Sequence, residues 1–164
     1  MVHLAPNHQK AQYCRVQTLG LLPAIFQNWF VSHGWSPYPH QLKILEIAQQ
    51  SPHALITAPT GGGKTLAGFL PTLIELSNDP QDSLHTLYVS PLKSLTVDIQ
   101  RNLDVPISEM SLPISVSVRT GDTKQIVRQH QRKKPPNILL TTPESLTLLL
   151  SYHDAPILFK TLKR

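Results

Sequence analysis

The sequence predicts an α/β fold with a mostly parallel sheet and flanking helices. Short apolar or β-branched runs alternate with longer segments of helical periodicity, and glycine, proline and hydroxyl residues occupy the turns between them. The 164 residues, 40% of them apolar, suffice for one domain with its own core. Because parallel α/β sheets bind ligands beyond the carboxyl ends of their strands, the turns after the strands are the places to search for a site.

The first half of the chain predicts three helices and one strand. Residues 23–34 begin at a proline and end at a glycine, which is typical helix punctuation. Residues 40–50 form a second helix, and residues 53–58 (HALITA) form a buried strand. Residues 64–76 form a third helix, in which Pro71 predicts a kink. The apolar stripe of this third helix is Leu66, Phe69, Leu70, Leu73 and Ile74.

The second half continues the alternation without repeats or low-complexity tracts. Its predicted strands are residues 84–90, 113–120 and 137–142, and its predicted helices are residues 92–103, 121–134 and 143–151. The first of these helices repeats an apolar residue on one face at Leu92, Leu95, Ile99 and Leu103. The second is polar and poor in core residues, and the third opens with Pro143, which the first helical turn tolerates.

The turn after the first predicted strand reads APTGGGKT, from Ala58 to Thr65. Glycines allow positive φ and close approach to a ligand, and successive N–H groups at a helix start form a concavity for anions. Lys64 supplies a charge for phosphates and Thr65 a hydroxyl for Mg²⁺. The turn therefore predicts a P-loop, with Ala58 in place of the usual first glycine.

Three further turns follow the other predicted strands and read SPLKSL, RTGDT and TTPESL. Each could be a plain turn or helix start, with Ser90 or Thr142 as a cap. Placed together at one edge of a sheet, their helix-start N–H groups, Lys93 and threonine hydroxyls are suited to phosphate contacts that do not read the bases.

Composition narrows the functional class. The net charge of +5 hints at a polyanionic partner, and part of it lies in the run RQHQRKK, Arg128 to Lys134, which reads as a solvated helix end or, less simply, as a nucleic-acid contact. The single cysteine, Cys14, permits no internal disulfide. The scattered histidines predict no metal site, and no signal peptide or membrane span is expected.

From about Pro23 to Arg164, the motifs PYPHQ, APTGGGKT, SPLKSL, RTGDT and TTPESL, in this order, resemble the first motor domain of superfamily 2 helicases. The branch is similar to the large-helicase-related proteins, in particular the ligase-associated DEXH-box DNA helicases of bacteria. The resemblance implies a RecA-like P-loop NTPase domain over residues 23–164, after an N-terminal tail of residues 1–22. It also implies a bacterial cytoplasmic location, 3′-to-5′ movement on DNA driven by ATP hydrolysis, and a role in DNA repair.

The resemblance assigns roles to residues. Gln41 corresponds to the glutamine that recognises adenine, with Phe30, Trp35 and Tyr38 as alternatives for an aromatic that stacks on it. ATP with Mg²⁺ is expected at Thr60, Gly61, Gly62, Gly63, Lys64 and Thr65. Single-stranded or partly duplex DNA is expected at Pro91, Leu92, Lys93, Thr120, Gly121, Thr142, Pro143 and Glu144. A DNA ligase and a metal-dependent nuclease are the implied protein partners.

One departure from the family pattern concerns hydrolysis. The D-E-x-H tetrad that holds Mg²⁺ and orients the attacking water is absent, so no catalytic residue is assigned. We therefore expect the chain to be the ATP-binding front part of a helicase, with a domain that is incomplete at its C-terminus, marginally stable and inefficient in hydrolysis. The alternative is a non-catalytic module that binds ATP or nucleic acid. A P-loop kinase or GTPase is disfavoured because it would not explain Gln41 or the three later turns.

Overall fold

The computed structural model describes residues 20–164, which divide into two compact units. One unit ends at Pro71, and the other runs from Thr72 to Arg164. Most of the predicted N-terminal tail, residues 1–22, lies outside the described residues, as does Cys14. Leu22, the last residue of that tail, is buried, and its carbonyl oxygen accepts a hydrogen bond from Gln27 Nε2 at 2.6 Å.

The first unit is helical. It contains α2 (Ala24–Ser32), α3 (Pro39–Gln50) and the first half of α4 (Lys64–Asn78). Both predicted helices before the P-loop are therefore present. Their apolar stripes supply the core of this unit, whose buried members on α2 and α3 are Phe26, Trp29, Phe30, Leu42, Ile44 and Leu45. The helix after the P-loop runs through Pro71 without ending there, and Phe69, Leu70 and Leu73 of its predicted stripe are buried.

The predicted buried strand at residues 53–58 is wrong. The segment joins no sheet, and its side chains are mostly exposed, with Leu55 88% accessible. A strand exists only where a neighbouring segment completes its ladder of hydrogen bonds, and no described residue pairs with this one. Apolar composition alone does not supply a pairing partner.

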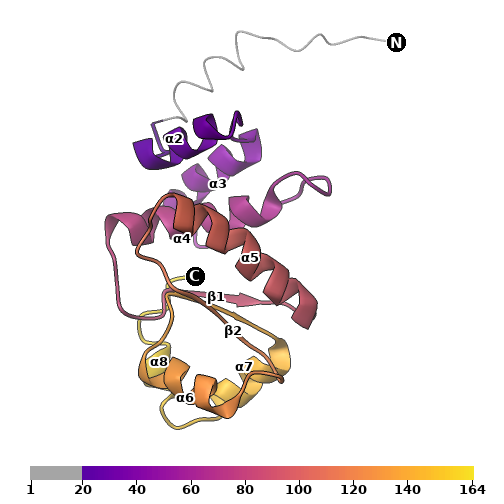
Figure 1. Cartoon of the computed structure of the whole chain (residues 1–164), viewed down its shortest axis with the longest axis vertical. Helices are drawn as coiled ribbons and strands as arrows, with labels where there is room; N and C mark the ends of the chain where they lie inside the picture. Colours follow the sequence, from indigo (N-terminus) through magenta and orange to yellow (C-terminus); the bar gives the residue numbers. More distant parts are fainter. Residues whose placement is uncertain (1–19) are drawn as a thin grey trace. The chain divides into compact units, whose positions relative to one another are not determined.

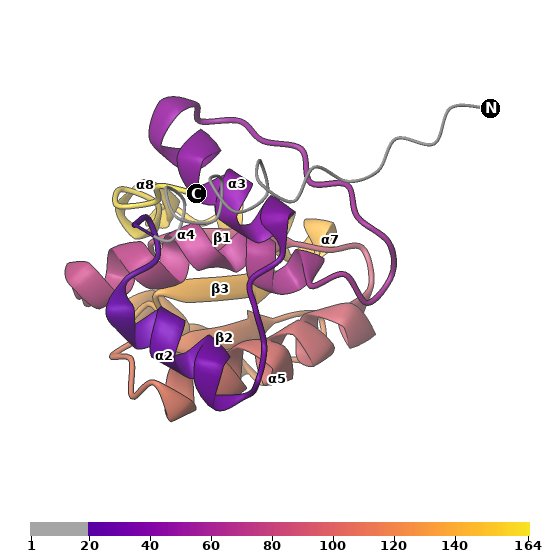
Figure 2. The same cartoon turned by 90° about the horizontal axis from the view of Figure 1, so that it is seen from above.

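The second unit contains a parallel sheet, as predicted, built from three of the four predicted strands. Its strands are β1 (Thr86–Val89), β2 (Val116–Arg119) and β3 (Ile138–Thr141), in the order β1-β3-β2. Figure 2 shows β3 between the other two. Ile138 is level with Thr86 on one side and with Val116 on the other, so the three carboxyl ends lie at the same edge.

Helices cover both faces of this sheet (Figure 1). Helix α5 (Lys93–Glu109) packs on one face, while α6 (Gln125–Lys133), α7 (Pro143–Leu150) and the short α8 (Ala155–Leu158) lie on the other. Every residue of β3 is buried, which explains its continuous apolar run. The side chains of β3 alternate between the faces, and Leu139 packs with Leu84, Leu149 and Leu158 on the α7–α8 side.

Helix α5 differs from its prediction in length and in its buried face. It continues past Leu103 to Glu109, through Pro106, and its buried stripe is Thr96, Ile99, Leu103, Pro106 and Ile107. Leu92 and Leu95 of the predicted stripe are instead 60% and 39% exposed. Pro106 lacks the N–H that would donate one helical hydrogen bond, and burial of Pro106 and Ile107 helps to offset that loss.

The β1 edge that faces away from β3 is partly paired. The N–H of Leu87 donates to the carbonyl oxygen of Arg164 at 2.9 Å, and the N–H groups of Lys163 and Arg164 donate to the carbonyl oxygen of His85. This is the hydrogen-bond pattern of a parallel pair. The polar backbone groups at this point of the β1 edge are thus satisfied.

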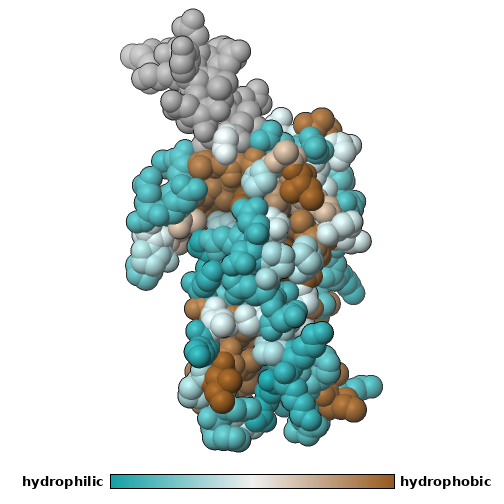
Figure 3. Space-filling model, turned by 90° about the vertical axis from the view of Figure 1, so that its left-hand side faces the viewer, coloured by the Kyte–Doolittle hydropathy of each residue, from teal (hydrophilic) through white to brown (hydrophobic). Residues whose placement is uncertain are grey.

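The described part of the chain has no helix with the length and apolar character needed to cross a membrane. On the face drawn in Figure 3, polar residues are interspersed with separate groups of apolar ones.

Candidate functional site

The loop before α4 has the backbone conformation of an anion-binding turn. Gly61 and Gly63 have φ values of +78° and +66°, which favour glycine strongly over other residues. The N–H of Gly62 donates to the carbonyl oxygen of Pro59 at 3.0 Å, which closes the turn. Helix α4 begins directly afterwards at Lys64, so its unpaired N-terminal N–H groups adjoin the loop.

The side chain of Lys64 folds back over this loop. Its Nζ donates to the carbonyl oxygens of Ala58 at 2.7 Å and Pro59 at 2.8 Å. These two bonds are exposed to water, so the ammonium group can exchange them for an anion at little cost. The residues predicted to bind phosphate, from Thr60 to Thr65, are thus consecutive in one turn, and the ammonium group of Lys64 lies over that turn.

Gln41 is 2% exposed and connects the start of α3 to the glycine loop. Its Oε1 accepts from the N–H of Tyr38 at 2.8 Å, as a helix-capping side chain does, and its Nε2 donates to the carbonyl oxygen of Gly63 at 3.2 Å. A Cβ on Gly63 would lie only 2.6 Å from that Nε2. The close approach explains why glycine occupies position 63, and Gln41 therefore has a structural role besides the predicted contact with adenine.

The three aromatic candidates for stacking on adenine have different surroundings. Phe30 is buried in the core of the first unit, edge-on to Trp29. Trp35 is stacked on His33 with a ring separation of 4.6 Å. Tyr38 is 50% exposed and stacks on His40, and a methyl group on Gly63 would lie 3.3 Å from its Cδ2. Tyr38 is therefore the exposed candidate that borders the glycine loop.

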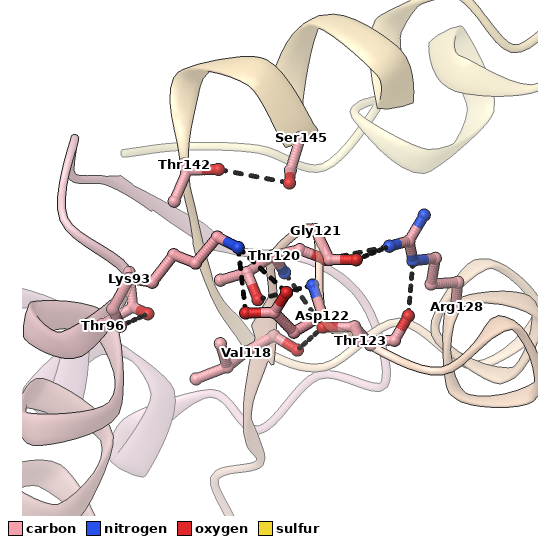
Figure 4. Close-up of polar contacts among 10 residues, drawn as sticks. All are labelled: Lys93, Thr96, Val118, Thr120, Gly121, Asp122, Thr123, Arg128, Thr142 and Ser145. Carbon is pink, nitrogen blue, oxygen red and sulfur yellow. Dashed lines mark hydrogen bonds and ion pairs between the residues drawn. The ribbon is translucent and has the colours of Figure 1, made fainter.

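In the second unit, three loops follow the carboxyl ends of the parallel strands, where the sequence predicts them. We call residues 90–93, 120–123 and 142–145 the strand-end surface (Figure 4). Its predicted residues differ in burial. Pro91, Leu92, Lys93, Gly121, Pro143 and Glu144 are exposed, whereas Thr120 and Thr142 are buried at 6% and 3% exposure. The two threonines support the loops, and the others are accessible to a ligand.

Lys93 and Asp122 link two of these loops, 29 residues apart in the sequence. Lys93 Nζ lies 2.9 Å from both carboxylate oxygens of Asp122. The side chains are 55% and 77% exposed, so water screens the pair and its contribution to stability is small. The carboxylate nevertheless neutralises the one lysine of the strand-end surface.

The third loop presents hydroxyl groups at the start of α7. Thr142 Oγ1 donates to Ser145 Oγ at 3.2 Å, and both side chains are buried. Thr141 Oγ1 donates to the carbonyl oxygen of Arg119 at 2.7 Å and so joins the ends of β3 and β2. The sequence analysis did not select Ser145, because the capping-box signal three positions after a helix cap is Glu or Gln and not serine.

The basic run of α6 is largely committed to internal contacts. Arg128 donates to the carbonyl oxygens of Thr120, Gly121 and Thr123. Arg132 pairs with Asp154 at 2.6 Å and lies over the ring of Tyr152 at 4.2 Å. The hydrogen bond from Arg132 lowers the pKa of Asp154. The interpretation of this run as a solvated helix end is therefore wrong for both arginines. Arg128 bonds the loop five to eight residues before it, and Arg132 bonds a residue 22 positions after it.

Arg119, at the end of β2, is 2% exposed, and its Nη1 donates to the carbonyl oxygen of Arg128 at 3.2 Å. Burial lowers its pKa, which the Tyr152 hydroxyl opposes. Within residues 20–164 no cluster of three or more histidine, cysteine or acidic side chains could hold a metal ion.

Residues 38–163 match the DEAD/DEAH box helicase family. The chain is 39% identical over 146 residues to the Lhr helicase/probable uracil glycosylase of Mycolicibacterium smegmatis, an alignment that covers 81% of this chain and 10% of that protein. The chain spans between 10 and 19% of the length of the first curated relatives it matches.

Solved structures give the same result. The structure of the Mycobacterium smegmatis helicase Lhr bound to ssDNA and AMP-PNP aligns with a TM-score of 0.80 and 37% identity, over 88% of this chain and 20% of that one. The DUF1998 helicase MrfA bound to DNA and AMPPNP aligns with a TM-score of 0.76 and 28% identity, over 87% and 20% of the two chains. The matches support a partial RecA-like helicase domain.

Proposed function

Because the chain belongs to the DEAD/DEAH box helicase family, we propose that it binds ATP with Mg²⁺ through residues 60–65 and is the ATP-binding part of an ATP-dependent DNA helicase. One observation carries the proposal. Lys64 Nζ occupies exchangeable, water-exposed bonds beside a turn whose two positive-φ glycines precede a helix N-terminus. This arrangement suits a triphosphate, whose negative charge is stabilised by the lysine, the loop N–H groups and the helix end.

For the base of the nucleotide, we propose Gln41 with Tyr38. The amide of Gln41 makes one bond through each of its polar atoms and retains a second N–H and a second lone pair. A donor and an acceptor side by side are what the edge of adenine requires. Tyr38 is half exposed and borders Gly63, so its ring can cover a base held next to the loop.

For the nucleic acid, we propose that the strand-end surface holds the phosphates of single-stranded DNA. Lys93 would supply the charge, and the N–H groups of Gly121 and of the first turn of α7 would supply neutral donors. The Lhr relative of known structure was solved with ssDNA and AMP-PNP, which supports both ligands for this chain. Movement from 3′ to 5′, a role in DNA repair, and the ligase and nuclease partners remain proposals from resemblance.

We expect slow ATP hydrolysis from this chain. Its 164 residues contain no adjacent Asp-Glu pair, and hydrolysis needs an acidic group for the metal and a residue that positions the attacking water.

The test is a pair of binding assays on the purified chain. A fluorescent ATP analogue with Mg²⁺ should bind the wild type, and Lys64→Ala should lose at least about tenfold in affinity. A labelled oligothymidylate should bind with an affinity that falls as salt rises, and Lys93→Ala should reduce the salt slope by about 0.7. Unchanged nucleotide binding by Lys64→Ala would remove the basis of the proposal. An RNA oligonucleotide that binds more tightly than DNA would redirect it to RNA.

A further inference from the structure

Arg128 holds the loop of residues 120–123 from the side of α6. Its Nε donates to the carbonyl oxygen of Thr123 at 2.7 Å, and its Nη2 donates to those of Thr120 at 3.1 Å and Gly121 at 2.6 Å. One guanidinium group therefore holds three of the four carbonyl oxygens of the 120–123 loop. Hydrogen bonds with a charged donor are stronger than neutral ones, so the peptide planes of the loop have little freedom to rotate.

The orientation of those carbonyl groups determines where the N–H groups point. In a trans peptide the C=O and the following N–H are antiparallel. Because the carbonyl groups of Thr120 and Gly121 point toward Arg128, the N–H groups of Gly121 and Asp122 point away from it. The N–H of Asp122 has only a long internal contact, 3.4 Å to Thr120 Oγ1.

Lys93 reaches the same loop from the other side. Figure 4 shows the loop between the side chains of Lys93 and Arg128. A methyl group on Gly121 would lie 3.5 Å from Lys93 Nζ, which places the ammonium group over the Cα of Gly121. The ammonium group, whose present partner is the exposed Asp122 carboxylate, therefore adjoins the outward N–H groups on the accessible side of the loop. A phosphate oxygen that displaces this carboxylate would find the charge and the N–H donors together.

We propose that Arg128 is a positioning residue for nucleic-acid binding, one that fixes the 120–123 loop so that its N–H groups and Lys93 can bind the same phosphate. The inference rests on the proposed function of the strand-end surface and adds a residue that does not itself touch the ligand. Arg128 acts through its fork of charged donors on the loop and not by contacting a phosphate itself. A lysine has one ammonium group and cannot reproduce the three bonds.

The test compares Arg128→Lys and Arg128→Ala with wild type in oligothymidylate binding over a range of salt concentrations. Both variants should bind about tenfold more weakly, because the loop must now be ordered on binding. Their salt slope should stay near that of wild type, since no phosphate-contacting cation is lost. Arg132→Ala is the matched control, because Arg132 lies one turn further along α6 and bonds Asp154 instead of the loop; it should bind within about twofold of wild type.

Amide hydrogen exchange supplies a second readout that does not depend on binding. In Arg128→Lys, exchange at Gly121 and Asp122 should speed up while the β3 amides keep their protection. Near-wild-type DNA affinity of Arg128→Lys, or a salt slope reduced by about 0.7 in Arg128→Ala, would overturn the inference by showing that the charge itself contacts phosphate. Wild-type protein that binds no oligonucleotide would refute the proposed nucleic-acid function as well, so the two failures are distinguishable.

Discussion

The side chain of Gln41 bridges the N–H of Tyr38 and the carbonyl oxygen of Gly63, at 2.8 and 3.2 Å, and so ties the helix start at PYPHQ to the glycine loop 22 residues later. Both polar atoms of a buried amide are satisfied within the first unit. The geometry of the phosphate loop and the residue proposed to recognise the base are therefore parts of one hydrogen-bonded structure.

Replacing Gln41 with alanine should impair folding and nucleotide binding together. The variant leaves the Gly63 carbonyl and the Tyr38 N–H without their partner, and we expect a loss of about 1–3 kcal/mol in the free energy of unfolding. Chemical denaturation and ATP-analogue titration measure the two effects. As a control, Gln49→Ala changes an exposed glutamine in the last turn of the same helix. Full stability with lost ATP binding in Gln41→Ala would mean that the bridge contributes nothing to the fold.

Alanine at Gly61 and at Gly63 should have different effects, although both residues have positive φ. At Gly61 no atom lies within 4 Å of the added Cβ, so only backbone strain of about 1–2 kcal/mol is expected. At Gly63 the Cβ would lie 2.6 Å from Gln41 Nε2, and the collision should add about 1–3 kcal/mol. Denaturant midpoints measure both losses. Equal midpoints would show that the loop and Gln41 are not in contact in solution.

Removing the Asp122 charge should strengthen DNA binding. Asp122→Asn frees Lys93 from its partner and removes a negative charge that repels phosphate, so we expect about three- to tenfold tighter oligothymidylate binding at low salt, with a smaller gain at high salt. Asp98→Asn is the matched control, since Asp98 is also exposed and paired, with Arg101 on α5. If both variants gain equally, the effect comes from net charge and the Lys93–Asp122 pair has no particular role.

His85 should make stability fall in mild acid. Burial lowers its pKa below the ordinary 6.5, while Glu75, 3.1 Å from Nε2, opposes the shift. The unfolded chain then binds a proton before the folded one does, so stability is complete above about pH 6.5 and declines as pH falls through that value toward the folded pKa. In His85→Gln, the melting temperature should depend less on pH in this window. If the plots of melting temperature against pH are parallel for the two proteins, protonation of His85 does not affect the stability of the fold.

Glu75 should reduce the stability of the fold only in stronger acid than His85 does. Burial raises the pKa of this carboxyl group, but the hydrogen bond and charge of Arg164, with His85 and Lys163, outweigh burial and lower it below 4.5. Stability from this group is therefore present above about pH 4.5 and lost as pH falls further. Because Glu75 and His85 lie 3.1 Å apart and each shifts the pKa of the other, Glu75→Gln should also change the acid response of His85.

Periodicity and turn composition were sufficient to predict the parallel sheet, the helices on its faces and the three loops at its carboxyl edge. They failed at residues 53–58 because a strand depends on a partner, and at Leu92 and Leu95 because the buried face of α5 is set by the sheet it packs on. The role of Arg132 could not be predicted, since it bonds Asp154, which only the fold brings near. Arg128 bonds backbone carbonyl groups five to eight residues before it, and composition does not indicate such bonds. The Lys93–Asp122 ion pair could not be predicted either, because only the fold brings these residues, 29 positions apart, together.

The central claim, that ATP binds the glycine loop, is tested most directly by titrating ATP with Mg²⁺ into isotope-labelled chain and following backbone and side-chain amide resonances. The account predicts that the largest shifts occur at residues 60–65 and at the side-chain amide of Gln41, and that Lys64→Ala abolishes them at the same ATP concentration. Shifts confined to other residues, or equal shifts in the variant, would contradict it.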